Sequence, residues 1–130
     1  MDLIRVTRDE GLRFSVRIRD HVVKADMSVE EGGRDEGLSP VELLGSSLGV
    51  CVAMAAQEFC DARGYTDGEV SVSLTLEMVE NPNRVAGLVA DVELPGDVPD
   101  EEKKKLRKMA LRFPVPASLR NEPRIDIDVL

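Results

Sequence analysis

The stretch that decides the fold is residues 39–64, which read SPVELLGSSLGVCVAMAAQEFCDARG. Ser39, Pro40 and Glu42 at its start are typical of a helix N-terminus: a capping hydroxyl, a proline at the first helical position and a capping-box glutamate. Arg63-Gly64 at its end supplies a cation for the negative end of the helix and a residue that tolerates the left-handed conformation. The sequence therefore predicts one helix from Pro40 to Arg63, roughly 36 Å long at about 1.5 Å per residue.

The middle of this helix carries no charged side chain between Leu43 and Gln57, and its apolar residues lie on every side. A helix of this kind is buried all round. The apolar run is too short and too rich in glycine and serine for a membrane span, which needs about 20 predominantly apolar residues. The cover must therefore be protein, and one chain of 130 residues has few other elements to supply it. Since Gly45-Ser46-Ser47 and Gly49 would let another helix approach closely, we expect a homodimer with paired central helices.

The remaining elements are short strands and a second helix. Alternation with a period of two and β-branched residues predict strands at Leu3–Thr7, Leu12–Arg19, His21–Ser28, Val70–Met78, Val85–Leu94 and Arg124–Leu130. An acidic start followed by a basic run predicts a helix from about Pro99 to Phe113, which Pro114 and Pro116 end. We expect one domain, residues 1–130, of the α+β class, with antiparallel sheets and a long buried central helix.

Two segments near the N-terminus carry expectations about exposure. In Leu12–Arg19 the apolar residues alternate with arginines and Ser15, which predicts a sheet with one covered apolar face and one wet polar face. Residues 30–37, EEGGRDEG, contain three glycines and five charged residues. This composition predicts a mobile loop.

Composition excludes several classes of function. The net charge is −8 and the pI is near 4.7, the wrong sign for a surface that binds nucleic acid. A single histidine and two cysteines give neither a conventional metal site nor a secreted disulfide framework, so we expect no metal and no cofactor. The N-terminus lacks the pattern of a secretory signal, and we expect a cytoplasmic protein without a membrane partner.

The two cysteines both fall in the predicted helix. Cys51 lies about three turns in, where an apolar setting raises a thiol's pKa and reactivity requires a cation or hydrogen-bond donor from elsewhere. Cys60 lies nine residues further on, about 180° around the helix and about 13 Å along it. The two thiols of one chain cannot form a disulfide while the helix is intact, so a disulfide would have to cross chains. We expect Cys60 to be a half-buried spectator.

At these residues the sequence resembles the OsmC/Ohr family, the osmotically inducible protein C and organic hydroperoxide resistance proteins. The resemblance lies in Gly32–Leu44 and Leu48–Cys51: a glycine-rich loop, a Ser/Asn-Pro-x-Glu-Leu motif and a cysteine eleven residues after the proline. The late segment Pro114–Leu119 also fits the family pattern. The resemblance implies an intertwined homodimer with the central helices at its interface.

For the hydroperoxidases of this family, the resemblance implies that Cys51 is the peroxidatic cysteine. Its thiolate would attack the peroxide O–O bond and become a sulfenic acid, while an arginine with a nearby glutamate keeps the thiolate ionised and orients the peroxide. The glutamate candidate is Glu42, although its capping role also accounts for it, and the arginine candidates are Arg34 and Arg8.

The chain departs from the family pattern at two positions. The second, resolving cysteine falls at Phe113, which cannot form a disulfide, and the carboxylate that follows the proline in the hydroperoxide resistance branch falls at Val41. We therefore expect a thiol-dependent hydroperoxide reductase whose Cys51 is reduced by an external thiol or by Cys60 of the partner chain. The alternative is a non-catalytic dimeric family member that binds a small hydrophobic ligand in the dimer pocket.

Overall fold

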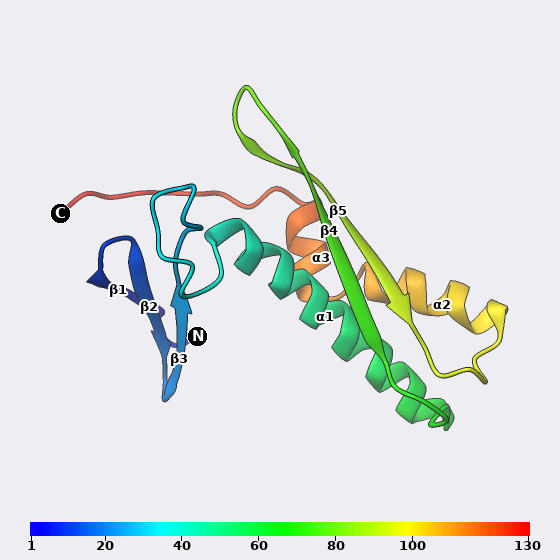
Figure 1. The fold of residues 1–130 in the computed structure, drawn as a ribbon. Helices are drawn as coiled ribbons and strands as arrows, with labels where there is room; N and C mark the ends of the chain where they lie inside the picture. The colour runs from blue at the N-terminus through cyan, green and yellow to red at the C-terminus, as the bar shows by residue number, and fades with distance from the viewer. The chain divides into compact units, whose positions relative to one another are not determined.

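A computed structural model describes residues 1–130 (Figure 1). Its elements are β1 (Arg5–Glu10), β2 (Arg13–Ile18), β3 (His21–Ala25), α1 (Pro40–Arg63), β4 (Ser71–Val79), β5 (Arg84–Glu93), α2 (Asp100–Ala110) and α3 (Pro114–Arg120). One sheet has the order β1-β2-β3 and the other pairs β4 with β5, all antiparallel. The predicted α+β class with antiparallel sheets is confirmed. The chain divides into two compact units, 1–44 and 45–130, which we describe separately; the single domain over 1–130 stays a prediction.

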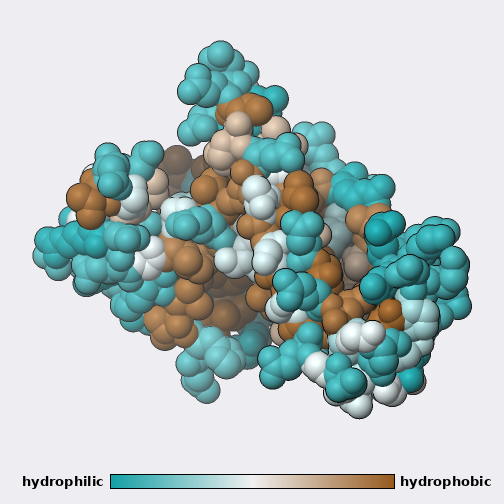
Figure 2. Space-filling model, turned by 45° about the vertical axis from the view of Figure 1, so that its right-hand side comes forward, coloured by the Kyte–Doolittle hydropathy of each residue, from teal (hydrophilic) through white to brown (hydrophobic).

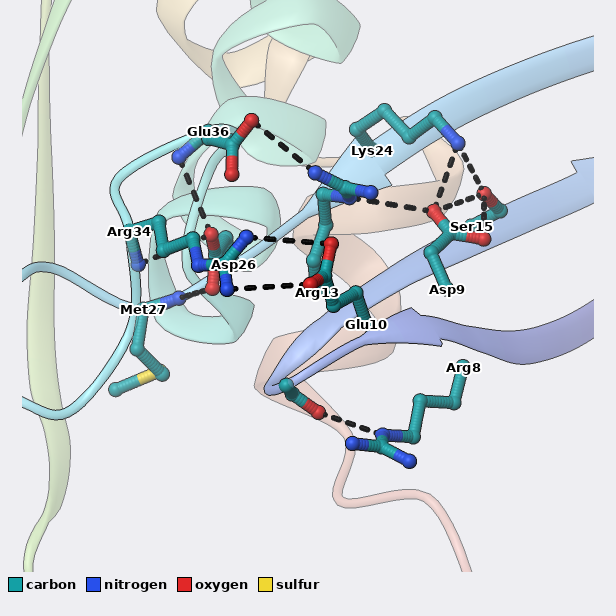
Figure 3. A network of polar contacts seen from close by, with 11 residues as sticks. Arg8, Asp9, Glu10, Arg13, Ser15, Lys24, Asp26, Met27, Arg34 and Glu36 are labelled. Carbon is teal, nitrogen blue, oxygen red and sulfur yellow. Dashed lines mark hydrogen bonds and ion pairs between the residues drawn. The ribbon is translucent and has the colours of Figure 1, made fainter.

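The polar face of β2 is covered at Ser15, where the prediction of a wet face is wrong, whereas Arg17 on the same face is exposed as predicted. Ser15 is the buried residue of β2, with no exposed surface. Its hydroxyl lies 2.7 and 2.9 Å from the carboxylate oxygens of Asp9, and Lys24 Nζ donates to Ser15 Oγ at 2.6 Å and to Asp9 at 2.7 Å (Figure 3). Hydrogen bonds from Lys24 and Ser15 lower the pKa of Asp9 to about 2. The buried hydroxyl of Ser15 is thus satisfied by side chains of its own sheet.

The segment after β3 is pinned, so the prediction of a mobile loop is wrong. Asp26 is 3% exposed, and its carboxylate accepts backbone N–H bonds from Met27 at 2.8 Å and from Arg34 and Glu36 at 3.2 Å (Figure 3). Burial opposes ionisation of Asp26, but these three donors outweigh it and lower the pKa of its carboxyl. A Cβ at Gly33 would lie 2.1 Å from the carbonyl oxygen of Met27, so glycine is required for this close packing.

The bounds of α1 agree with the prediction. The Ser39 N–H donates to Glu42 Oε1 at 2.9 Å and the Glu42 N–H donates to Ser39 Oγ at 3.3 Å, which confirms the capping box. At the other end Gly64 has a φ of 75°, and the N–H of Tyr65 donates to the Cys60 carbonyl at 2.9 Å. Both ends of the helix are therefore capped where the sequence predicted, by Ser39 and Glu42 at the start and at Gly64 at the end.

One face of α1 is buried within the chain, and the prediction of burial on every side, which requires cover from a second copy, stays a prediction. The buried residues are Gly45, Leu48, Ala55, Ala56, Phe59 and Cys60. On the other side Val50 is 52% exposed and Met54 61% exposed, and further apolar side chains are uncovered on the surface (Figure 2). By length and composition α1 could cross a membrane, a test that the core helix of a folded protein also passes. One chain thus supplies cover for one side of the helix only, as its small number of other elements led us to expect.

The core of the unit 45–130 forms where the second half of α1 meets α2 and the strand β5. Its buried members are Ala56, Phe59, Cys60, Val98 and Leu106, against which Val92, Leu94 and Met109 pack. Arg63 closes the edge of this core, because its guanidinium lies 3.6 Å from the centre of the Phe59 ring and 2.7 Å from Glu102.

The end of the chain differs from the predicted strand. The prolines after α2 begin the helix α3 with Phe113 as its N-cap, which is consistent with proline at the first helical position. Residues 121–130 form no strand, and Ile125 and Ile127 are 78% and 83% exposed. A strand requires an edge with free N–H and C=O groups to pair with, and this segment pairs with none in its own chain.

The close approach of α1 to the β4–β5 hairpin is testable at Gly45. A Cβ there would lie 2.8 Å from Leu74 Cδ2 and 3.1 Å from Leu76 Cδ2. We expect Gly45→Ala to have a free energy of unfolding about 1 kcal/mol or more below that of Gly49→Ala, because the tips of two leucine side chains must shift to admit the Cβ, which offsets the gain in helix propensity. Gly49→Ala is the matched control in urea denaturation, since a Cβ at Gly49 meets nothing within 4 Å in the chain. Equal stability of the two variants would contradict this packing.

Candidate active site

Cys51 lies on the flank of α1, between its buried and its uncovered face. Its side chain is partly buried, with the buried Leu48 and Ala55 to one side and the exposed Val50 and Met54 to the other. The middle of α1 carries no charged residue, so a charged partner for this thiol has to come from another part of the protein. Cys51 is therefore neither sealed in the core nor fully exposed.

Cys60 is fully buried, which corrects the expectation of half-burial. It belongs to the core cluster with Phe59 and Leu106 and has no exposed surface. Burial, followed by the nearby charges of Asp61 and Asp97, raises the pKa of the Cys60 thiol. A buried thiol that resists ionisation is a poor nucleophile and a poor partner for a disulfide between chains.

Glu42 is held by the helix cap. Its carboxylate accepts the Ser39 N–H, and hydrogen bonds from the backbone and hydroxyl of Ser39 lower the pKa of Glu42. Val41, one residue earlier, offers no carboxylate. The capping role of Glu42 is thus visible in the geometry, and its catalytic role stays a prediction.

The two candidate arginines differ in what their guanidinium groups contact (Figure 3). Arg34 forms two contacts of 3.2 Å with the carboxylate of Glu10, one from Nη1 and one from Nη2. Arg8 donates only its Nε–H, to the carbonyl oxygen of Gly11 at 2.8 Å, and forms no ion pair. The terminal nitrogens of Arg8 therefore remain available to an anion, whereas those of Arg34 are paired.

Phe113, which the resemblance places at the resolving position, has a structural role in this chain. Phe113 is half-buried, donates its N–H to the Ala110 carbonyl at 3.1 Å and accepts the N–H of Ala117 at 2.9 Å. It joins the end of α2 to the start of α3. No group of three His, Cys, Asp or Glu side chains is arranged to hold a metal ion.

Sequence reasoning missed one feature of the unit 45–130, a cavity of about 510 Å³ bordered by α1, β5 and α2. Cys51 does not line it, although its neighbours Leu48 and Val52 do. Two basic residues one turn apart, Lys103 and Arg107, also border the cavity. The sequence carries only an indirect signal of the cavity, the spacing of these two basic residues beside the apolar Leu106 and Ala110.

Several solved structures share this fold at low identity. An OsmC like protein from Mycoplasma pneumoniae has a TM-score of 0.79 at 16% identity, covering 94% of this chain and 89% of its own. The organic hydroperoxide resistance protein OsmC from Legionella pneumophila has a TM-score of 0.64 at 15% identity, covering 92% and 89%. A protein from Psychrobacter arcticus, named for osmotic stress induction and detoxification response, has a TM-score of 0.82 at 24% identity, covering 91% and 88%. No curated protein matches the chain.

These identities establish the fold, and the family follows from the sequence match. The model of the family described as OsmC-like protein matches residues 33–128, well over half of the chain. The matched segment contains the glycine-rich loop, the capped start of α1 and Cys51. The chain belongs to the family of OsmC-like proteins.

Proposed function

We propose that this protein is a thiol-dependent hydroperoxide reductase with Cys51 as its peroxidatic cysteine. The observation that carries the proposal is the contrast between the two thiols: Cys51, which the family resemblance assigns as peroxidatic, is only partly buried, whereas Cys60 has no exposed surface. Membership of the OsmC-like family and the likeness to a protein named for organic hydroperoxide resistance support the reaction class.

The reaction needs only the thiol, the peroxide and two reducing thiols. The Cys51 thiolate attacks one peroxide oxygen and the O–O bond breaks, giving Cys51 sulfenic acid and an alkoxide, which takes a proton and leaves as the alcohol. A reducing thiol then condenses with the sulfenic acid, releasing water and forming a mixed disulfide. A second thiol exchanges with that disulfide, which restores Cys51 and releases the oxidised reductant.

The reducing thiols come from outside the chain in this proposal. Phe113 supplies no sulfur at the family's resolving position, and Cys60 is buried with a raised pKa. Exposing Cys60 would require opening the core formed with Phe59 and Leu106. An external thiol needs access only to Cys51, which is partly buried on the flank of α1 rather than sealed in the core.

Arg8 is the better candidate for the arginine that the mechanism requires. Its guanidinium is anchored by one hydrogen bond from Nε and keeps its terminal nitrogens free. Arg34 would first have to leave Glu10. Both arginines are solvent-exposed, so releasing the Arg34 pair costs little, about 0–1 kcal/mol, and the preference for Arg8 rests on its free donors.

Turnover of an organic hydroperoxide with excess dithiothreitol tests the proposal. We expect Cys51→Ser to lose activity to the background of the buffer, because the hydroxyl is no substitute for a thiolate. Cys60→Ala should retain it, since Cys60 takes no part. Thermal unfolding of both variants controls for folding. An active Cys51→Ser variant, or loss of activity in a folded Cys60→Ala variant, contradicts the assignment.

The choice between the arginines is tested in the same assay. We expect Arg8→Gln to reduce kcat/KM by about a hundredfold or more, the scale of losing a charge-assisted contact to a reacting anion. Arg34→Gln is the matched control and should change kcat/KM less than threefold. Arg8→Lys should recover part of the loss, because the charge is kept. The opposite ranking of the two glutamine variants would assign the role to Arg34.

We also propose that the working unit is a homodimer. On the uncovered face of α1, Ser47, Val50 and Met54 follow one another at intervals of three and four residues, the spacing of a helix–helix contact. At the C-terminus, the exposed Ile125, Ile127 and Val129 alternate with charged residues, which suits a strand added to the sheet of a second copy.

Light scattering tests the dimer. We expect twice the chain mass of 14.3 kDa. Met54→Glu should shift the population to monomers, because a buried unpaired charge costs several kcal/mol, about 3 or more. Asn83→Glu adds the same charge at an exposed turn outside α1 and should remain dimeric. Removal of residues 121–130 should weaken the dimer as well. A wild-type protein of single-chain mass would overturn the proposal.

A further inference from the structure

The cavity of about 510 Å³ in the unit 45–130 has apolar walls. α1 contributes Leu48, Val52 and Ala56, which recur every four residues on its inner face. β5 contributes Leu88, Ala90 and Val92, which alternate onto one face of the hairpin. This volume falls in the range of small-molecule sites, which are about 300–1,000 Å³ and mostly apolar.

The charge at the border of the cavity is positive. Lys103 and Arg107 are one helical turn apart on α2, on the side that also carries Leu106 and Ala110 to the cavity. Arg107 forms no ion pair, and the only ion pair of Lys103, at 3.5 Å, joins it to Asp100, a carboxylate that is 92% exposed. Asp91 also borders the cavity, but the alternation of β5 directs its side chain to the opposite face from Ala90 and Val92.

We propose that this cavity binds an amphipathic monoanion, an unbranched alkyl chain that ends in a carboxylate. The alkyl chain lies against the α1 and β5 walls, and the carboxylate accepts hydrogen bonds from Arg107 and Lys103. Charge selects this occupant: the two cations lie at one edge of an apolar space in a protein whose net charge is −8, so an anionic head is matched there and a cationic head is repelled.

The reacting thiol is not part of this site, although Leu48 and Val52, on either side of Cys51 in the sequence, border the cavity. Cys51 does not line the cavity, and neither candidate arginine belongs to the unit that contains it. Binding therefore requires no thiol, and a folded protein without peroxidase activity would still bind the ligand. The two proposals can fail independently.

Isothermal titration of decanoate below its micelle concentration, with decanol as the neutral analogue, tests the site in the full chain. We expect decanoate to bind at one site per chain and Cys51→Ser to bind it equally well. Lys103→Gln combined with Arg107→Gln should weaken decanoate at least tenfold and leave decanol nearly unchanged, because only the head-group contacts are lost. Lys104→Gln combined with Lys108→Gln removes the same charge from other sides of α2 and should leave both affinities unchanged.

A second variant tests the apolar walls. Ala110→Phe fills the space beside Arg107 and should abolish binding of both decanoate and decanol, with thermal unfolding as the check of folding. The proposal is overturned if the wild-type protein binds neither compound. It is also overturned if the Lys103/Arg107 variant binds decanoate as well as the control pair does, or if the two compounds bind the wild-type protein with equal affinity.

Discussion

The charge-free middle of α1 is the constraint on which the rest of the structure depends. No side chain of this helix from Leu43 to Gln57 is charged. The β4–β5 hairpin and α2 cover one side of the helix only, where Phe59 and Cys60 are buried. At about 25 cal/mol per Å² of apolar surface, leaving the other side uncovered forfeits stability that an added protein surface would recover. The same asymmetry distinguishes the two thiols, because Cys60 lies on the covered side of the helix and Cys51 lies at the edge of that side.

The segment that leads into α1 is built as firmly as the helix itself. Asp26 gathers three backbone N–H groups, and the glycines at 33 and 37 allow the chain to pass where a Cβ would meet a carbonyl oxygen. The capping box between Ser39 and Glu42 then starts the helix. The motif that identifies the family is therefore a structural device as much as a chemical one: its glycines and its glutamate have local roles that hold without any reaction.

Features of the fold could be predicted from the sequence when the residues that interact are close together along the chain. The bounds of α1, its capping box and the strands of both sheets follow from neighbours within a few residues, and the sequence predicted them closely. Asp26 and Ser15 were missed because their partners lie up to ten residues away and their polar character pointed to solvent. The strand predicted at the C-terminus is absent for a different reason. Alternating apolar and polar residues indicate that a segment can pair with the edge of a sheet, but not that its own chain provides that edge. For the site, the position of Cys51 on the helix could be predicted from the sequence. The ion pair of Arg34 with Glu10 and the cavity beside Arg107 could be found only from the structure.

The central claim is that Cys51 carries the chemistry and Cys60 does not. The most direct measurement is peptide mass spectrometry after one equivalent of an organic hydroperoxide in the presence of dimedone, which traps sulfenic acids. The account predicts a dimedone adduct on the peptide that contains Cys51 within the first turnover and an unmodified Cys60. An adduct that appears on Cys60 at the same rate, or no adduct on Cys51 while the peroxide is consumed, would contradict it.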